Sequence, residues 1–196
     1  MSELHPFEIG IHVHGVVSRQ MPFFMSEMDA CYLACAIAEA GDGDYAEVGT
    51  AFGGSAAFAV LVKRELVQDG TVFTIDPLPG SNDGPPPSFD GATADVVETH
   101  FRNMGVANRV TLIQKLSEPW PLPDRQFACA LIDGNHTDGW PKRDWTNLAP
   151  RTLHRVVFHD YRTGHGQVDG VVKEVSHEGW KLEYARDGIA ILERTT

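Results

Sequence analysis

The sequence is poor in basic residues. Lysine and arginine total 16 against 27 acidic residues in a chain of 196, which gives a formal net charge of −11 at pH 7. Proteins that bind nucleic acid regardless of its sequence need a basic surface that displaces counterions. This composition therefore argues against a nucleic-acid partner.

Signals for membranes and secretion are missing as well. No apolar run approaches the length of a transmembrane helix, so we expect no membrane partner. Residues 1–15 have neither the basic start nor the apolar centre of a secretory leader. A cytoplasmic protein is expected, and at this length the chain is most simply one domain with a core of its own.

Cysteine is scarce, with only Cys31, Cys35 and Cys129. The first two are four positions apart and can share a helix face, but no second pair completes a zinc site. Because their neighbours are mostly apolar, we predict buried free thiols.

The sequence does contain a regular alternation of two patterns. Short apolar runs typical of strands alternate with helix-compatible segments. The strand-like runs are residues 45–50, 71–76, 109–114, 128–133 and 155–160, and the helix-like segments are residues 55–68, 93–105, 140–150 and 168–179. This alternation predicts an α/β fold, a doubly wound and mostly parallel sheet with helices on both faces.

Both ends of the chain differ from this pattern. Two alternating runs flank Arg186-Asp187-Gly188, which predicts a C-terminal antiparallel hairpin and a sheet of seven strands. An early helix is expected to begin after Ser26, which can cap it. His12 and His14 alternate on one face of a possible strand; we predict a short exposed strand in preference to a metal pair, since no third ligand is identifiable.

Polar residues end nearly every predicted strand, namely Glu47, Asp76, Gln114, Asp133 and the pair His159-Asp160. Aspartate there can simply form a turn or cap a helix. In open α/β sheets, however, ligands bind beyond the carboxyl ends of the strands. The set as a whole predicts a ligand site at this edge.

The glycine-rich turn after the first strand reads Glu47-x-Gly49-x-x-x-Gly53-Gly54-Ser55. It is neither the GxGxxG of a dinucleotide site nor a P-loop, which ends in GK[ST]. An acid at its mouth suits a ligand that has a cation and no phosphate. Asp76, at the end of the next strand, can accept hydrogen bonds from both hydroxyls of a ribose. A nucleoside with a positively charged tail is therefore predicted, although the paired glycines also suit a plain tight turn.

Four stretches, "AEVGTAFGGSA", "FTIDP", "ALIDGNHTDGWPKRDW" and "VVFHDY", together resemble a class I S-adenosylmethionine-dependent methyltransferase with its Rossmann-like fold. The likeness is greatest to the small-molecule O-methyltransferases of the macrocin and mycinamicin sugar type, and more distant to the catechol type. It runs from about Phe23 to the end, so residues 23–196 are expected to form the methyltransferase domain and residues 1–22 an N-terminal extension.

The resemblance implies how S-adenosylmethionine is held. The glycines let the backbone approach the methionine part, one acid lies near its ammonium, another holds the ribose, and the stretch 114–117 borders the adenine. The implied cofactor residues are Glu47, Gly49, Gly53, Ser55, Asp76, Ser117 and Asp133.

Asp133 and Asp160 end strands that this fold places side by side, and two converging carboxylates repel each other unless a proton or a metal lies between them. A divalent metal, Mg²⁺ or Mn²⁺, is therefore predicted, with Asp133 and Asp160 as ligands. His159 is the candidate third ligand. The sugar enzymes have two adjacent acids where this chain has His159-Asp160, and strand alternation sends these two to opposite faces unless the strand ends between them. Ligation by His159 favours a transition metal.

His136 follows Asp133 by three positions. The sugar enzymes have a histidine at this offset as general base, and the catechol type has a lysine. We therefore predict that His136 and Asp133 are catalytic, with His136 accepting the proton of the substrate. The alternative is a loop histidine that bonds to neighbouring backbone.

The resulting prediction is an O-methyltransferase that acts on a hydroxyl of a small molecule, such as a sugar or another natural product. A non-catalytic S-adenosylmethionine-binding or interaction module and an NAD-dependent oxidoreductase are the alternatives. The proline-rich segment 77–91 is either a lid or an inert connector. The sequence leaves the oligomeric state open, a homo-oligomer included.

Overall fold

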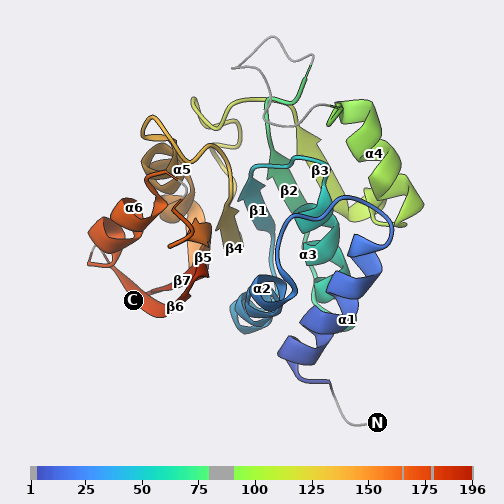
Figure 1. Cartoon of the computed structure of the whole chain (residues 1–196), viewed down its shortest axis with the longest axis horizontal. Helices are drawn as coiled ribbons and strands as arrows, with labels where there is room; N and C mark the ends of the chain where they lie inside the picture. The colour runs from blue at the N-terminus through green and yellow to red at the C-terminus, as the bar shows by residue number, and fades with distance from the viewer. Residues whose placement is uncertain (1–3, 80–90, 165, 178, 196) are drawn as a thin grey trace.

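The structure is a computed structural model that describes residues 4–79, 91–164, 166–177 and 179–195. One seven-stranded sheet runs through the molecule in the order β3-β2-β1-β4-β5-β7-β6 (Figure 1). The strands are β1 (Tyr45–Val48), β2 (Val72–Ile75), β3 (Val110–Ile113), β4 (Phe127–Ile132), β5 (Thr152–Tyr161), β6 (Trp180–Arg186) and β7 (Gly188–Arg194).

The first five strands pair in parallel, while β7 is antiparallel to both β5 and β6. The predicted fold class and the C-terminal hairpin are confirmed. From β1 the chain winds outward to β2 and β3 and then returns to β4 on the other side of β1. The strand order thus reverses between β1 and β4, where a doubly wound sheet binds ligands.

The helices cover both faces of the sheet. They are α1 (Pro6–Ser18), α2 (Glu27–Ala40), α3 (Gly54–Glu65), α4 (Ala94–Asn103), α5 (Trp140–Leu148) and α6 (Val168–Val175), with short 3₁₀ turns at Ala107–Arg109 and Ala149–Arg151. Helices α1 to α4 pack into one apolar cluster and α5 and α6 into another, on the opposite face (Figure 1). Along β1, Tyr45 joins the first cluster whereas Ala46 and Val48 join the second, as the alternation of a strand requires.

The expected N-terminal strand is wrong, because His12 and His14 lie within helix α1. His5 caps this helix in a reciprocal arrangement with Glu8, and Pro6 occupies its first turn. The apolar residues at helical spacing, Ile9, Val13 and Val17, are buried in the first cluster. His14 is turned inward, with its Nε2 3.1 Å from the Met25 carbonyl oxygen.

Ser26 begins α2 as predicted, since its hydroxyl accepts a hydrogen bond from the Asp29 amide at 3.1 Å. Cys31 and Cys129 are buried and Cys35 is partly exposed, and all three are free thiols. Most of the proline-rich segment, residues 80–90, lies outside the described residues. In the part of the chain that the structure describes, no helix is long and apolar enough to span a bilayer.

Candidate active site

A cavity of about 670 Å³ lies at the carboxyl ends of β1, β2, β4 and β5. Its volume is in the range of small-molecule and cofactor sites. Six of the predicted site residues line it next to the strand ends, namely Gly49, Asp76, Asp133, His136, His159 and Asp160. Ser55 and Ser117 line it as well, whereas Glu47 and Gly53 lie behind its surface. The predicted site residues are therefore gathered at the point where the strand order reverses.

Gly49 is required by the close approach of two strand ends. Its φ is +98°, and a Cβ at this position would lie 2.1 Å from the Asp133 carbonyl oxygen. Gly53 begins α3 with φ +89°, where a Cβ would meet the Phe101 ring at 2.7 Å. Larger residues at either position would displace the turn. This packing requirement accounts for both glycines even before a ligand is considered.

Glu47 is completely buried beneath the glycine-rich turn. Its Oε1 accepts hydrogen bonds from Thr74 Oγ1 at 2.8 Å and from Ser55 Oγ at 3.1 Å. Burial raises the pKa of Glu47 to about 8, although both hydroxyl donors act in the opposite direction. Ser55 thus lies between this carboxyl group and the cavity.

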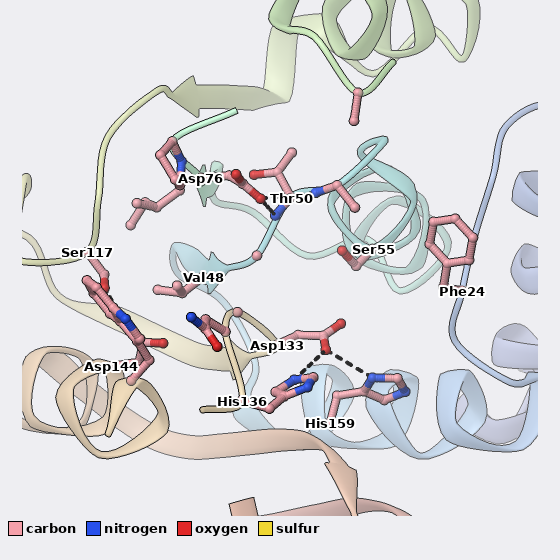
Figure 2. A pocket seen from close by; sticks show the side chains of 18 of the residues that line it. Phe24, Val48, Thr50, Ser55, Asp76, Ser117, Asp133, His136, Asp144 and His159 are labelled. Atoms are coloured by element: carbon pink, nitrogen blue, oxygen red, sulfur yellow. Dashed lines mark hydrogen bonds and ion pairs between the residues drawn. The ribbon is translucent and has the colours of Figure 1, made fainter. Parts of the chain in front are cut away.

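Asp76 ties the turn to the end of β2. Its Oδ2 accepts from the amides of Thr50 at 2.8 Å and Ala51 at 3.2 Å, and its Oδ1 accepts from the Leu78 amide at 2.9 Å. A carboxylate has about four acceptor positions, so three donors leave capacity for a ligand hydroxyl. Figure 2 shows Asp76 and Thr50 together on one wall of the cavity.

Asp144 is a buried acid that the sequence did not single out. It lies on α5, and its Oδ1 accepts a hydrogen bond from the buried hydroxyl of Ser117. Burial raises the pKa of Asp144 to about 6. Both residues line the cavity, at the end opposite Phe24 (Figure 2). The predicted adenine-side residue Ser117 is thus fixed by a carboxyl group from another element.

Asp133, His159 and Asp160 form a compact group of acidic and imidazole side chains. Each offers a ligand atom, and these atoms lie within 4.8 Å of one another. His159 Nδ1 is 3.0 Å from Asp133 Oδ1 and 3.5 Å from Asp160 Oδ2. The predicted metal residues are therefore brought together on the cavity wall.

The backbone of β5 resolves the difficulty that strand alternation raised for His159 and Asp160. The pairing of β5 with β7 shifts between His159 and Tyr161, so that Asp160 is an extra residue in the strand. Asp160 has φ +57°, a left-handed conformation that costs a residue other than glycine about 1–2 kcal/mol. Such a bulge redirects a side chain. It places Asp160 beside His159 although the strand does not end between them.

His136 lies next to this group, on the loop after β4. Its Nε2 is 3.7 Å from Asp133 Oδ1 and 3.6 Å from Asp160 Oδ2, and Figure 2 shows Asp133 between the two histidine rings. The interaction with Asp133 raises the pKa of His136 against the opposing effect of burial. Burial is the largest single influence on His159 and acts to lower its pKa, but the charges and hydrogen bonds of Asp133 and Asp160 together outweigh it and raise this pKa to about 11.

The group suits a divalent cation. Two carboxylates and two imidazoles face one another, and the raised pKa of each ring favours a bound proton in the metal-free protein. A divalent cation bound here would likewise offset the negative charge of the two carboxylates. The donor set of two carboxylate oxygens and one imidazole nitrogen is one that transition metals accept.

The cavity is acidic and partly apolar. Four aspartates line it, and Lys115 is the single lysine or arginine among the described residues of its wall. Phe24, which is 59% exposed, and Phe52 contribute an aromatic wall, with ring centroids 6.1 Å apart. A cationic ligand suits this surface better than an anion.

Solved structures share this fold at low sequence identity. The O-methyltransferase NovP is 18% identical, with a TM-score of 0.70 over 97% of this chain and 98% of that one. The O-methyltransferase TomG of Streptomyces achromogenes, involved in tomaymycin synthesis and solved with S-adenosylmethionine, is 16% identical, with a TM-score of 0.68 over 100% and 92%. Among curated proteins, none has a significantly similar sequence.

The sequence itself matches a family described as "Methyltransferase domain" over residues 46–161. This range begins in β1 and ends with β5, so it includes the glycine-rich turn, His136 and the three grouped residues Asp133, His159 and Asp160. The expectation of a class I S-adenosylmethionine-dependent methyltransferase is confirmed. Because the match spans more than half of the chain, the protein belongs to the methyltransferase domain family.

Proposed function

We propose that this methyltransferase transfers a methyl group to a hydroxyl of a small molecule, with the assistance of a divalent cation. The observation that carries the proposal is the convergence of Asp133, His159 and Asp160 beside His136 on the wall of the cavity. A group of acids and imidazoles at this place has a chemical use in moving a proton off a hydroxyl. Binding of the cofactor alone does not require such a group.

The proposed cofactor residues follow the cavity from end to end. Ser117 borders the adenine, Asp76 accepts from the ribose, and Ser55 with Gly49 meets the methionine part. Glu47 supports Ser55 from behind, and Gly53 shapes the turn. Asp133 lies where this series meets the metal residues. S-adenosylmethionine supplies a methyl group on a positively charged sulfur, and the acidic lining of the cavity favours that charge.

The proposed metal ligands are Asp133, His159 and Asp160. A bound divalent cation would supply Lewis acidity and orient the acceptor. His136 is the proposed general base, with Nε2 accepting the hydroxyl proton at the edge of the same group. Asp133 contacts both histidines, which orients their rings toward the cavity.

The proposed acceptor is a small neutral molecule, such as a sugar or another natural product. The aromatic wall of Phe24 and Phe52 offers it an apolar surface, and the shortage of basic side chains in the wall disfavours a phosphorylated acceptor. The net charge of −11 disfavours a nucleic acid.

Calorimetric titration tests the proposal. S-adenosylmethionine is titrated into metal-free protein, and again with Mg²⁺ or Mn²⁺, for the native chain, Asp133→Ala and the exposed control Asp124→Ala. We expect cofactor binding by the native chain and the control under every condition, and a metal signal that Asp133→Ala lacks. A panel of hydroxyl acceptors then tests for methyl transfer. If S-adenosylmethionine binds in none of these conditions, the proposed cofactor site is overturned. If Asp133→Ala still gives a metal signal, the proposed set of metal ligands is overturned.

A further inference from the structure

Asp29 is a buried acid on α2, outside the glycine-rich turn and the group of proposed ligands. Only 6% of the residue is exposed. Its Oδ2 accepts a hydrogen bond from Ser26 Oγ at 2.5 Å, while Oδ1 has no hydrogen-bond partner among the described residues. A buried carboxylate with a vacant acceptor is costly unless a positive or donating group lies nearby.

The imidazole of His159 lies next to this carboxylate, on the side of Oδ2. Its Nε2 lies 4.0 Å from Asp29 Oδ2, while its Nδ1 faces Asp133 and Asp160. The imidazole therefore has carboxylates at both nitrogens. Asp29 is the one acid that the described part of the chain brings to the Nε2 side.

The start of β7 leaves space for the carboxylate of Asp29 in the core. β7 begins at Gly188, and a Cβ there would lie 2.6 Å from Asp29 Oδ2 and 2.7 Å from Oδ1. The glycine thus makes room for the carboxylate between α2 and the end of β5, where β7 pairs with Tyr161. Gly188 also has φ +105°, so the hairpin backbone and the carboxylate both favour glycine at this position.

We infer that Asp29 is a positioning residue: its carboxylate, 4.0 Å from His159 Nε2, favours the tautomer with the proton on Nε2 and so directs the Nδ1 lone pair toward the metal. The inference rests on the proposed metal site. A neutral imidazole has one N–H, and Nδ1 can ligate only when that proton is on Nε2. A carboxylate behind a ligating histidine fixes both the tautomer and the ring orientation, and its loss typically weakens metal binding by about 10–100-fold.

Titration of Mn²⁺ into three otherwise intact proteins tests the inference: the native chain, Asp29→Asn and Ser26→Ala. Ser26→Ala is the matched control, because it removes both the cap of α2 and the hydrogen bond to Asp29 Oδ2 but keeps the carboxylate that faces His159. We expect Asp29→Asn to bind Mn²⁺ about 10–100-fold more weakly, with unchanged affinity for S-adenosylmethionine in metal-free protein. Ser26→Ala should melt at a lower temperature and bind Mn²⁺ within about twofold of the native chain.

A second measurement uses only the native chain and so does not depend on the folding of a variant. In the native chain loaded with diamagnetic Mg²⁺, ¹⁵N NMR of the imidazoles should show His159 with its proton on Nε2. The opposite tautomer would overturn the inference.

The titration has three contrary outcomes. Equal Mn²⁺ affinity in native protein and folded Asp29→Asn would overturn the inference and leave the metal site intact. Equal losses in Asp29→Asn and Ser26→Ala would assign the effect to the Ser26–Asp29 hydrogen bond and the helix cap, not to the carboxylate that faces His159, and would also overturn the inference. If native protein binds S-adenosylmethionine but neither Mn²⁺ nor Mg²⁺, the metal part of the proposed function fails, and the role of Asp29 fails with it.

Discussion

His159 Nδ1 lies 3.0 Å from Asp133 Oδ1, although the two residues are 26 positions apart and belong to the ends of different strands. Parallel pairing of β4 with β5 brings the two strand ends together, and the bulge at Asp160 adds a second carboxylate. The group therefore depends on tertiary structure that no single motif contains.

The imidazole of His159 should govern metal preference. Replacement of this nitrogen donor by oxygen in His159→Asp should reduce the preference for Mn²⁺ over Mg²⁺ by roughly one order of magnitude. Titration of both metals gives the ratio of the two dissociation constants. His12→Asp makes the same change at an exposed position of α1 and should leave the ratio as it is. An unchanged ratio in His159→Asp would remove His159 from the ligand set.

His136→Gln should lower kcat by about 10²–10⁴-fold, the usual contribution of a general base. Dissociation constants for S-adenosylmethionine and Mn²⁺ should change little, because neither proposed ligand set includes His136. Single-turnover methyl transfer with saturating cofactor separates the two effects. A variant that retains native kcat would show that another group takes the proton.

Glu47 should make stability fall as pH rises. Burial raises its pKa to about 8 from 4.5, so the folded protein holds this proton more tightly than the unfolded chain. The contribution is complete below pH 4.5 and is lost as pH rises to about 8. Glu47→Gln has no proton to lose at this position. The difference between its melting temperature and that of the native chain should therefore shift in favour of the variant as pH rises across this window.

Asp144→Asn provides the comparison for Glu47→Gln, because the pKa of Asp144 is raised only to about 6. Its effect on the pH dependence of melting should therefore be complete at lower pH. The melting temperatures of Glu47→Gln and the native protein are plotted against pH from about 5 to 9, a range that spans the raised pKa. If the two plots are parallel, Glu47 does not hold a proton in the folded state.

Gly49→Ala should destabilise the fold by about 2–3 kcal/mol, since the new methyl group meets the Asp133 carbonyl at 2.1 Å. Gly105→Ala is the control, because Gly105 also has a positive φ, +65°, but a Cβ there would have no neighbour within 4 Å. It should cost only about 1 kcal/mol. Chemical denaturation measures both, and equal losses would mean that backbone strain, not the contact with Asp133, requires glycine at position 49.

The sheet could be predicted from sequence because each strand of the parallel part is a short apolar run that ends in a polar residue. Helix α1 could not, since its histidines alternate with apolar residues as in a strand, and the deciding signals are the His5 cap and Pro6. The candidate metal residues were predictable from their positions at strand ends, whereas the bulge that unites His159 with Asp160 depends on pairing with β7.

The sequence around Asp144 has no signal of its burial, and the Ser26-x-x-Asp29 pattern indicates a helix start but not a buried acid. Each is an acid on an amphipathic helix, where an acid is usually exposed. Their burial depends on Gly188 and Ser117, which are distant in sequence.

The aromatic wall of the cavity comes from elements other than those that hold the proposed catalytic group. Phe24 lies between α1 and α2, and Phe52 lies in the turn before α3, whereas Asp133, His136, His159 and Asp160 follow β4 or end β5. Substitutions in the wall can therefore change the surface offered to the proposed acceptor without moving the groups proposed to take its proton. Under the proposed function, natural selection or protein engineering can change the range of acceptors separately from the transfer of the proton.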